Sequence, residues 1–408
     1  MNAHQAAAEA VIVGYVRTPI GRYAGALASV RPDTLLAHVI RALLERTRLD
    51  PNEVDDVIMG CANQAGEDNR NVARMAALLA DLPVRVPGQT VNRLCGSGLQ
   101  AINAAAHAIW SGQGEVFIAG GVESMTRAPL VMLKPESAYP RGVPPMADST
   151  LGWRFAHPMM EERGYTASLG QTAENVAERR GVSRADQDAL AVLSQRKTAR
   201  AVDSGRLARE IVATPVPQPK AEPVLVERDE HPRPDTSLEQ LARLKPAFVR
   251  DGTVTAGNSS GINDGAAALL VTSAKRARSL GLEPLARVVT TAVAGVEPDE
   301  MGLGPIPASR TALQRAGLTI EEMAVIEINE AFASQVIASL EDLGVDWRDE
   351  ERVNPSGGAI ALGHPLGASG ARLAGTAALE LQQRPAHYAL VTMCIGVGQG
   401  IATVLAGD

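Results

Sequence analysis

The sequence contains few cysteines, and this scarcity excludes several classes of protein. Its 408 residues include three cysteines, Cys61, Cys95 and Cys394, and an odd count this small does not suit a disulfide scaffold. No pair of cysteines has CxxC spacing, and cysteine and histidine do not cluster as they do in zinc sites, so no metal is expected. The three thiols are therefore predicted to be free, and the question is which of them react.

Basic charge and long apolar runs are also lacking. The net charge is −7 and no stripe of Lys or Arg stands out, so neither nucleic acid nor an anionic membrane surface is an expected partner. No apolar stretch reaches the length of a membrane span. The first residues lack the basic segment and apolar run of a signal peptide, and we expect a cytoplasmic protein.

What the chain does contain is a regular alternation of short apolar elements. Aromatic residues make up 3% of the chain and hydrophobic residues 45%, a balance that suits close packing of helices on sheets. The alternation predicts an α/β fold with a mostly parallel sheet. The predicted elements are strands at residues 11–16, 57–59, 89–94 and 116–119, and helices at residues 35–47, 71–82 and 99–110.

The C-terminal part repeats this order of elements. Residues 49–54 resemble residues 318–323, each lying between a helix and a strand. The Gly-rich turn at residues 96–98 likewise matches the one at residues 367–370. We interpret the match as an internal duplication that produces two similar α/β halves. The predicted elements of the second half are helices at residues 310–316, 331–343 and 371–383, and strands at residues 325–328 and 388–393.

A segment of different composition, residues 128–258, separates the two halves. It holds about half of the 25 prolines, and its clearest helix begins at Ser183. Such an insertion indicates a lid or an excursion from the first half. The predicted domains are therefore residues 1–127, resuming at 259–281, the inserted lid at 128–258, and a second half at 282–408.

Cys95 lies on a Gly-rich turn between a predicted strand and a predicted helix. The unpaired N–H groups of a helix N-terminus favour a thiolate, and a strand–turn–helix arrangement exposes a nucleophile. A free cysteine is also often a small buried hydrophobe. The position of Cys95 is therefore compatible with both roles.

Three further polar residues are predicted to lie near Cys95. His364 occupies the turn that corresponds to the Cys95 turn in the second half, where it would face Cys95 and accept its proton. Asn329 and Cys394 follow or end predicted strands, and all four residues are expected at the carboxyl ends of strands. Two thiols, an imidazole and a carboxamide suit carbanion chemistry on a thioester. Cys61 belongs to no such motif and is expected to pack in the core or at the rim.

These motifs together resemble the thiolase family over essentially the whole chain. The motifs are residues 92–100 (NRLCGSGLQ), 120–129 (GGVESMTRAP), 252–268 (GTVTAGNSSGINDGAAA), 329–332 (NEAF), 357–370 (GGAIALGHPLGASG) and 394–400 (CIGVGQG). The resemblance implies a layered α-β-α-β-α core of two halves with mixed sheets, and an acyltransferase that needs no cofactor beyond its coenzyme A and acyl-CoA substrates. It also implies a homo-oligomer, either a dimer or a tetramer built from dimers.

The resemblance assigns a role to each of the matching residues. Cys95 would be the nucleophile that becomes acylated, and His364 would activate Cys95 and then the CoA thiol. Cys394 would protonate the departing acetyl-CoA carbanion or deprotonate acetyl-CoA in the reverse direction. One oxyanion hole would use His364 and a water held by Asn329, and the other the backbone N–H groups of Cys95 and Gly396.

The family also implies where CoA would bind, beneath the insertion. Arg233 matches a position at the adenosine end of CoA, and Ser260 matches one at the pantetheine arm. Many family members have His-Met-Gly where this chain has Ser-Leu-Gly at residues 168–170, which indicates a different acyl pocket. Arg154 and His157 are candidates for binding a substrate that ends in a carboxylate, although a surface or packing role is common for such residues.

The substrate is predicted from further stretches that resemble thiolases acting on 3-oxoadipyl-CoA in aromatic degradation. These are residues 60–77, 151–155 and 229–245. The alternatives are an acetyl-CoA acetyltransferase and a 3-ketoacyl-CoA thiolase of fatty-acid β-oxidation. A decarboxylating ketosynthase would carry a second histidine in place of Cys394, and a non-catalytic acyl-CoA or lipid carrier would have lost Cys95 or His364.

Overall fold

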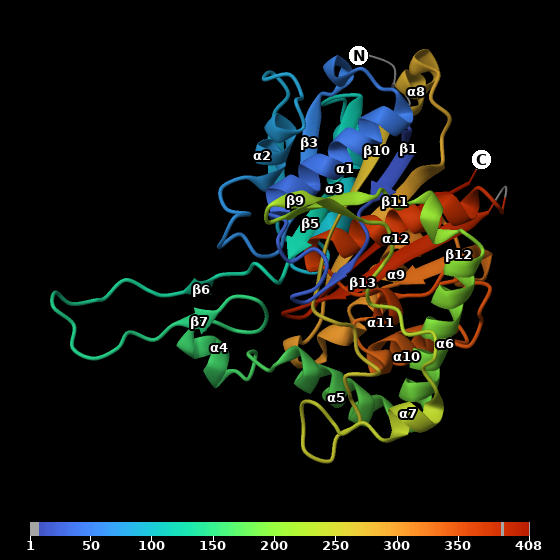
Figure 1. Ribbon diagram of the computed structural model, residues 1–408. Helices are drawn as coiled ribbons and strands as arrows, with labels where there is room; N and C mark the ends of the chain where they lie inside the picture. Colours follow the sequence, from blue (N-terminus) through green and yellow to red (C-terminus); the bar gives the residue numbers. More distant parts are fainter. Residues whose placement is uncertain (1–7, 385–386, 408) are drawn as a thin grey trace, which may run out of the picture.

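The computed structural model describes residues 8–384 and 387–407 of the chain (Figure 1). In these residues, ten strands form one mixed sheet in the order β12-β13-β14-β11-β1-β10-β5-β3-β4, with β2 paired to β10. The strands are β1 (Ala10–Arg17), β2 (Gly21–Arg22), β3 (Asp56–Gly60), β4 (Gly88–Val91), β5 (Val116–Ser124), β10 (Asn263–Ser273), β11 (Ala286–Gly295), β12 (Met323–Ile328), β13 (Tyr388–Ile395) and β14 (Gln399–Ala406).

The sheet consists of two copies of one strand pattern, joined where β1 pairs antiparallel with β11. Outward from this join, β10 and β5 in one half correspond to β14 and β13 in the other, each pair antiparallel. Next come β3 and β12, which run parallel to β5 and β13. Finally, β4 corresponds to a parallel bridge between Val353 and Ile326. The duplication inferred from the sequence is therefore present in the strand order.

The expectation of a mostly parallel sheet is wrong. β10 in the first half and β14 in the second half each run antiparallel to both of their neighbouring strands. β14 is antiparallel because it returns from β13 through a tight turn in which Val397 and Gly398 have φ values of 63° and 74°. β10 is antiparallel to both β1 and β5, and the chain reaches it only after the long insertion. Gly and Asn tolerate such left-handed turns far better than branched residues do, so Val397 is a strained position.

The helices form three layers that alternate with the two halves of the sheet. Side chains point alternately to the two faces of a strand, so Val116 and Ile118 pack against α1 and α2, whereas Phe117 and Ala119 pack against α3 and α12. On the far face of the second half lie α9, α10 and α6. The helices of the two halves are α1 (Pro32–Thr47), α2 (Val72–Leu79), α3 (Ser97–Trp110), α8 (Ala274–Leu280), α9 (Pro305–Ala316), α10 (Ala333–Asp342), α11 (Ala359–Leu362) and α12 (Leu366–Leu381). The resulting order is the α-β-α-β-α core expected from the family.

Short 3₁₀ helices show the duplication at the level of local structure. The segments 49–54 and 318–323, matched in the sequence, contain the 3₁₀ helices Pro51–Glu53 and Ile320–Glu322, and each leads directly into its strand, β3 or β12. Asp50 caps the first and Thr319 the second. The other 3₁₀ helices span Leu207–Arg209 and Pro298–Leu303.

The insertion follows the first half in the chain, but its helices α5 and α6 pack on α10 and α11 of the second half. Two buried ion pairs attach it to the first half, because Arg17 of β1 pairs with Glu210 at 3.1 Å and with Asp229 at 2.6 Å. The insertion therefore bridges both halves and is not an excursion on the first alone. Its elements are β6 (Leu130–Val131), β7 (Ala147–Asp148), α4 (Pro158–Glu162), α5 (Leu169–Arg180), α6 (Arg184–Asp203), β8 (Thr214–Gln218), β9 (Ala221–Val226) and α7 (Leu238–Ala242).

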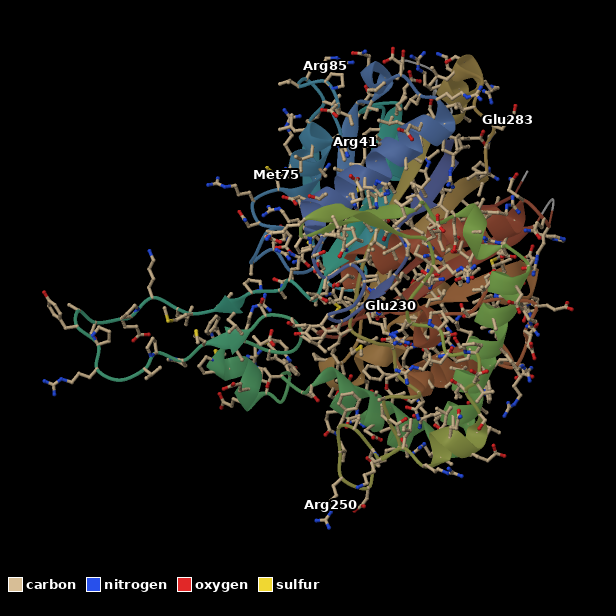
Figure 2. The ribbon with its side chains drawn as sticks, in the orientation of Figure 1. Arg41, Met75, Arg85, Glu230, Arg250 and Glu283 are labelled. Carbon is tan, nitrogen blue, oxygen red and sulfur yellow. The ribbon has the colours of Figure 1, made fainter. Side chains whose placement is uncertain are left out.

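Two parts of the insertion extend away from the body of the molecule. The arm that contains β6 and β7 projects furthest (Figure 1), and Tyr139 and Val143 near its tip are 96% and 94% exposed. The loop after α7 also projects, and the side chain of Arg250 points from it into solvent (Figure 2). Within the residues that the structure describes, no helix has the length and apolar character needed to cross a membrane.

Most predicted elements are confirmed, and their ends differ for local reasons. α1 begins at Pro32, not near residue 35, because Arg31 in an extended conformation acts as N-cap and proline suits the first helical turn. Ser183 caps α6 as expected, its hydroxyl accepting a hydrogen bond from the Asp186 backbone N–H. β5 continues through Gly120 and Gly121 to residue 124, because these glycines lie where a Cβ would collide with the backbone of a neighbouring element. The predicted domain boundaries at residues 127, 258 and 281 stay a prediction.

The closest approach between α3 and α12 yields a first prediction. A Cβ on Gly370 would lie 2.4 Å from the Leu99 backbone nitrogen, so Gly370→Ala should force the two helices apart. We expect a loss of about 1–3 kcal/mol in the free energy of unfolding, measured by urea denaturation, despite the higher helix propensity of alanine. The matched control is Gly295→Ala, where the nearest atom to an added Cβ is 4.0 Å away and a change below about 0.5 kcal/mol is expected. Equal stability of the two variants would contradict this account of the helix contact.

Candidate active site

Cys95 lies on the turn between β4 and α3, where the backbone is tightly constrained. Leu94 has a φ of 46°, and its N–H donates to the Asn92 side chain at 2.9 Å. The next residue, Gly96, is a glycine because a Cβ at this position would lie 2.5 Å from the Ile395 side chain. The turn presents Cys95 at the start of α3 with 8% of its surface exposed. The predicted strand–turn–helix setting of the cysteine is confirmed.

The imidazole of His364 is held by polar contacts on both ring nitrogens. Nδ1 lies 2.6 Å from Ser369 Oγ, and Nε2 lies 3.3 Å from Asn329 Nδ2. Ser369 Oγ also contacts the Pro365 carbonyl at 2.9 Å, and it can donate its single proton only once. Both contacts of Ser369 are satisfied when its hydroxyl donates to Pro365 and accepts from Nδ1–H. In this tautomer Nε2 is unprotonated and accepts from the Asn329 side-chain nitrogen, so its lone pair can serve as a base if that contact is exchanged.

Cys394 is linked to Asn329 through a buried glutamine. Gln335 of α10 is fully buried, and its carboxamide lies 3.0 Å from Cys394 Sγ. The carboxamide orientation that satisfies its hydrogen bonds directs the nitrogen to the Asn329 carbonyl at 3.2 Å, while the oxygen accepts from the Val336 N–H at 2.8 Å. The same nitrogen then faces the Cys394 sulfur. Gln335 therefore holds Cys394 and the Asn329 backbone in one arrangement.

Burial decides the charge state of the reacting groups. It raises the pKa of the Cys95 thiol to about 11, and the opposing effect of the Gly396 backbone N–H beside the sulfur is smaller. Burial also lowers the pKa of His364 to about 3, and the nearby Arg372 adds to this shift. For Cys394, burial raises the pKa well above its usual range, and the neighbouring Cys95 raises it further. At neutral pH both thiols and the imidazole are uncharged, so the thiolate favoured by a helix N-terminus does not form at Cys95 in the unliganded protein.

A cavity of about 410 Å³ opens at Cys95 and Gly396. Two segments of the insertion, residues 149–155 and residues around 165–172, contribute much of its wall, as expected for a lid. Most lining side chains are apolar, among them Leu94, Leu151, Trp153, Phe155, Leu169, Met301, Leu366 and Val397. A cavity of this volume is large enough for a short acyl chain.

The residues predicted to be catalytic form one connected group, and the residues predicted to bind CoA lie apart from it. Cys95 lies beside Gly396 and Cys394, and Cys394 is linked through Gln335 to Asn329 and then to His364. The expectation that every one of them ends a strand is wrong for His364, which follows the short helix α11.

The predicted CoA-binding residues lie outside this cavity. The Ser260 N–H donates to the Ala331 carbonyl at 2.9 Å, which places it next to the Asn329 segment. Arg233 is exposed, and its backbone N–H donates to the Gln195 side chain at 2.8 Å. Neither residue is among those lining the cavity, and their contact with CoA stays a prediction.

Sequence reasoning missed the polar groups that hold the loops of the site. The His364 backbone N–H donates to Asn263 Oδ1 at 2.9 Å, and a Cβ on Gly363, whose φ is 105°, would collide with the Asn263 side chain. Glu123 accepts three backbone N–H groups, from residues 62, 63 and 367, at 2.8–3.0 Å. Asn263 begins β10 and Glu123 lies one residue before the end of β5, so the available signal was a polar residue at the end of an apolar strand within the quoted motifs.

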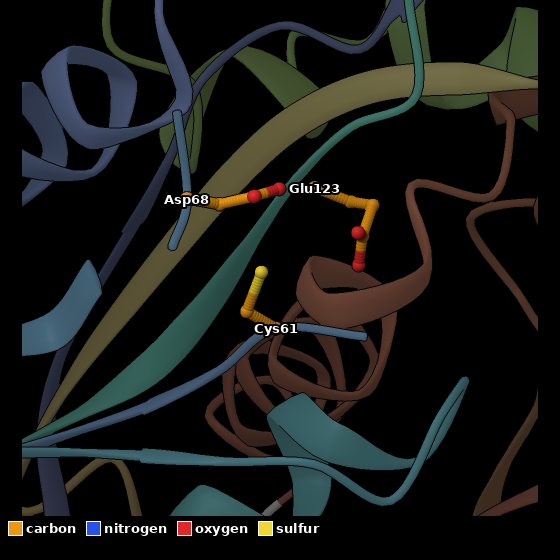
Figure 3. A group of neighbouring side chains, drawn as sticks. All are labelled: Cys61, Asp68 and Glu123. Carbon is orange, nitrogen blue, oxygen red and sulfur yellow. The ribbon is translucent and has the colours of Figure 1, made fainter. Parts of the chain in front are cut away.

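Cys61 lies beside two buried carboxylates, Asp68 and Glu123, as Figure 3 shows. Potential ligand atoms of the three residues lie within 4.8 Å of one another. However, both Glu123 oxygens already accept backbone N–H groups, and the Cys61 thiol donates to the Asn63 carbonyl at 3.0 Å. Asp68 in turn accepts the Gly66 N–H at 3.0 Å, so the three residues are engaged in holding the loop at residues 61–68, and they do not argue for a metal ion.

The duplicated α/β fold places Cys95 on the wall of a mostly apolar cavity, with Cys394 beside it and with Gln335 and Asn329 linking Cys394 to the imidazole of His364. Two thiols, an imidazole and a carboxamide in one such group are typical of an acyltransferase. The family models make the class specific, because residues 10–275 match the N-terminal domain of thiolase and residues 282–407 match the C-terminal domain. The chain belongs to the thiolase family.

Relatives with known names support this membership over nearly the full length. The chain is 58% identical over 398 residues to a 3-oxoadipyl-CoA/3-oxo-5,6-dehydrosuberyl-CoA thiolase of Escherichia coli, covering 97% of this chain and 99% of that protein. It is 48% identical to an acetyl-CoA acetyltransferase of Pseudomonas aeruginosa, covering 98% and 100%. The crystal structure of the Bacillus anthracis acetyl-CoA acetyltransferase superposes with a TM-score of 0.91 at 38% identity, covering 98% and 99% of the two chains.

Alkylation of Cys95 tests the charge state deduced from burial. Below a pKa of about 11, the thiolate fraction rises tenfold per pH unit, so the iodoacetamide alkylation rate of the Cys95 peptide should rise about tenfold per unit from pH 7 to 10. The rate is measured by mass spectrometry of the digested protein. The Cys61 peptide of the same sample is an internal control and should stay unlabelled, since Cys61 is fully buried. A plateau below pH 8 would show instead that Cys95 and His364 exist as an ion pair.

Proposed function

We propose that this thiolase cleaves 3-oxoadipyl-CoA with CoA to acetyl-CoA and succinyl-CoA, through an acyl group carried on Cys95. The observation that carries the proposal is the position of Cys95 on the wall of a mostly apolar cavity, with the Gly396 N–H beside its sulfur. The substrate is supported by relatives at 55–58% identity, which are named 3-oxoadipyl-CoA or β-ketoadipyl-CoA thiolases.

The first half of the proposed reaction acylates Cys95. His364 Nε2 accepts the Cys95 proton as Sγ attacks the C3 carbonyl of the substrate, which is consistent with the neutral state of both groups. The C2–C3 bond then breaks, and its electrons pass into the enolate of acetyl-CoA. Cys394 donates its thiol proton to C2, which releases acetyl-CoA and leaves the acyl group on Cys95.

The second half returns the enzyme to its starting state. His364 first passes the proton it took from Cys95 to the Cys394 thiolate, and its neutral Nε2 then accepts the CoA thiol proton as the CoA sulfur attacks the thioester carbonyl on Cys95. The bond between Cys95 Sγ and the acyl carbon breaks, succinyl-CoA forms, and His364 returns a proton to Cys95. Cys394 regains its proton in the same cycle, so the balance closes without an oxidant or reductant.

Negative charge develops on two oxygens during the proposed reaction, that of the acyl group on Cys95 and that of the acetyl-CoA enolate, and each needs hydrogen-bond donors. For the acyl-Cys95 intermediate, the backbone N–H groups of Cys95 and Gly396 are the proposed donors, supported by the contact of Gly396 with the sulfur. For the acetyl-CoA enolate, we propose His364 and a water held by Asn329. Asn329 Oδ1 is buried and has no hydrogen-bond partner among the residues that the structure describes, so it can accept from such a water.

Other predictions about the chain belong to the same proposal. The exposed apolar side chains on the projecting arm support a homo-oligomer, dimer or tetramer, because a lone monomer would leave them in water. Acyl-CoA is the proposed partner, with CoA contacting Arg233 and Ser260, and no metal or organic cofactor takes part. The insertion acts as the lid domain over the two halves, and the protein works in the cytoplasm.

Acylation of Cys95 is the direct test of the mechanism. Incubation with succinyl-CoA should add a succinyl mass to the Cys95 peptide, and Cys95→Ser should lower thiolysis by about 10³-fold or more, since serine is a much weaker nucleophile at neutral pH. Cys61→Ser is the matched control and should retain activity, because a serine hydroxyl can also donate to the Asn63 carbonyl. Full activity of Cys95→Ser without any adduct would rule the mechanism out.

A substrate panel tests the proposed specificity. We expect kcat/KM for thiolysis of 3-oxoadipyl-CoA to exceed that of acetoacetyl-CoA by at least about 10-fold, because a short acetyl group would leave most of the apolar cavity unfilled. The rates are followed by the loss of substrate absorbance. Comparable rates on the two substrates would favour a general acetyl-CoA acetyltransferase over the proposed enzyme.

A further inference from the structure

One formally charged side chain lines the cavity at Cys95. Among the described residues on its wall, Arg154 is the single member of the Asp, Glu, Lys and Arg group. Arg154 belongs to the insertion, whereas Cys95 and Gly396 on the same cavity wall belong to the first and second halves of the core. Arg154 is partly exposed on this mostly apolar wall, where a bound carboxylate would complement its charge.

Arg154 has no carboxylate partner within the described part of the chain. Its guanidinium makes one contact, with the Ser149 carbonyl at 3.5 Å, and it forms none of the ion pairs found in the structure. The side chain is only partly exposed. Guanidinium groups bind carboxylates through two parallel N–H···O bonds, and most of the five N–H donors of Arg154 remain available for such a partner.

The backbone around Arg154 is held at a defined position relative to Cys95. The Asn63 side-chain nitrogen donates to the Ser149 carbonyl at 2.9 Å, and the Asn63 backbone N–H donates to Glu123 in the core at 3.0 Å. Directly before Arg154, Trp153 Nε1 donates to the Ala167 carbonyl at 3.3 Å. These contacts hold the guanidinium-bearing loop against the same cavity as the nucleophile. Because the guanidinium is held at a fixed position relative to Cys95, it can select acyl groups whose terminal anion lies at one particular chain length.

We propose that Arg154 binds the terminal carboxylate of the acyl group carried on Cys95, and so selects 3-oxoacyl-CoA substrates that end in a carboxylate. The inference rests on the proposed function and names the residue that reads the far end of its substrate. Leu151, Phe155 and Met301 on the same wall cover the methylene groups between the thioester and the carboxylate. A methyl-ended acyl chain of equal length would fit the cavity but leave Arg154 without a partner.

The test compares two substrates of equal chain length. 3-Oxoadipyl-CoA and 3-oxohexanoyl-CoA differ in having a carboxylate or a methyl group at the end of the acyl chain, and both carry the same CoA. The measured quantity is the ratio of their kcat/KM values in thiolysis. Arg154→Met keeps the length of the apolar stem and removes the charge, and it should lower this ratio by about 10²-fold. Arg154→Lys keeps a cation and should recover part of the loss.

A control variant and three contrary outcomes distinguish failure of the Arg154 assignment from failure of the proposed function. Arg163→Met removes an exposed arginine from the same insertion, outside the cavity, and should leave the ratio as in the unmodified enzyme. If Arg154→Met lowers kcat/KM equally for both substrates, Arg154 binds a CoA phosphate or supports the loop, and the assignment is overturned. If the ratio is high and Arg154→Met retains it, the Arg154 assignment fails while the proposed function stands. If the unmodified enzyme shows no preference between the two substrates, the proposed function itself fails.

Discussion

The close contact between the N-terminal ends of α3 and α12 is the constraint on which the site depends. A Cβ on Gly98 would lie 2.5 Å from the Gly367 carbonyl, and a Cβ on Gly370 would lie 2.4 Å from the Leu99 nitrogen, so any larger residue would separate the helices. The turn that carries Cys95 precedes α3, and the loop that carries His364 precedes α12. Since the two helices form the middle layer between the sheet halves, their contact fixes the Cys95 turn of the first half relative to the His364 loop of the second.

Burial then sets the chemistry that this site can support. A water-filled cleft would leave Cys95 partly ionised and His364 partly protonated near neutral pH, whereas the low-dielectric setting keeps both neutral. The nucleophile is therefore generated when a substrate is present to accept the charge. The same burial gives oxyanion donors and a single cation such as Arg154 more influence than they would have in water.

One buried carboxylate connects the catalytic loops to the wall of the cavity. Glu123 binds backbone N–H groups of the loop at residues 62–63 and of Gly367 at the start of α12. Asn63 extends this link to Ser149 in the insertion. Burial raises the pKa of Glu123 to about 7, because three backbone donors offset only part of the cost of removing its charge from water. This arrangement ties the position of Ser149 in the insertion to the position of α12, although the two are far apart in sequence.

Local signals in the sequence were enough to determine the two-half plan and the α/β class, and to single out Cys95, His364, Asn329 and Cys394 as candidate residues, whose roles the family resemblance then implied. These signals are short range: hydrophobic periodicity, Gly-rich turns and repeated motifs depend on neighbouring residues, and the duplication let the His364 turn be matched with the Cys95 turn. Tertiary structure alone decided the direction of β10 and β14, the packing of α5 and α6 on the second half, and the contacts of Gln335, Asn263 and Glu123. It also decided that Arg154, one arginine among many in the sequence, is the one Asp, Glu, Lys or Arg among the described residues on the wall of the cavity. Contacts between residues this far apart in the chain depend on how the layers stack, and no local pattern records that.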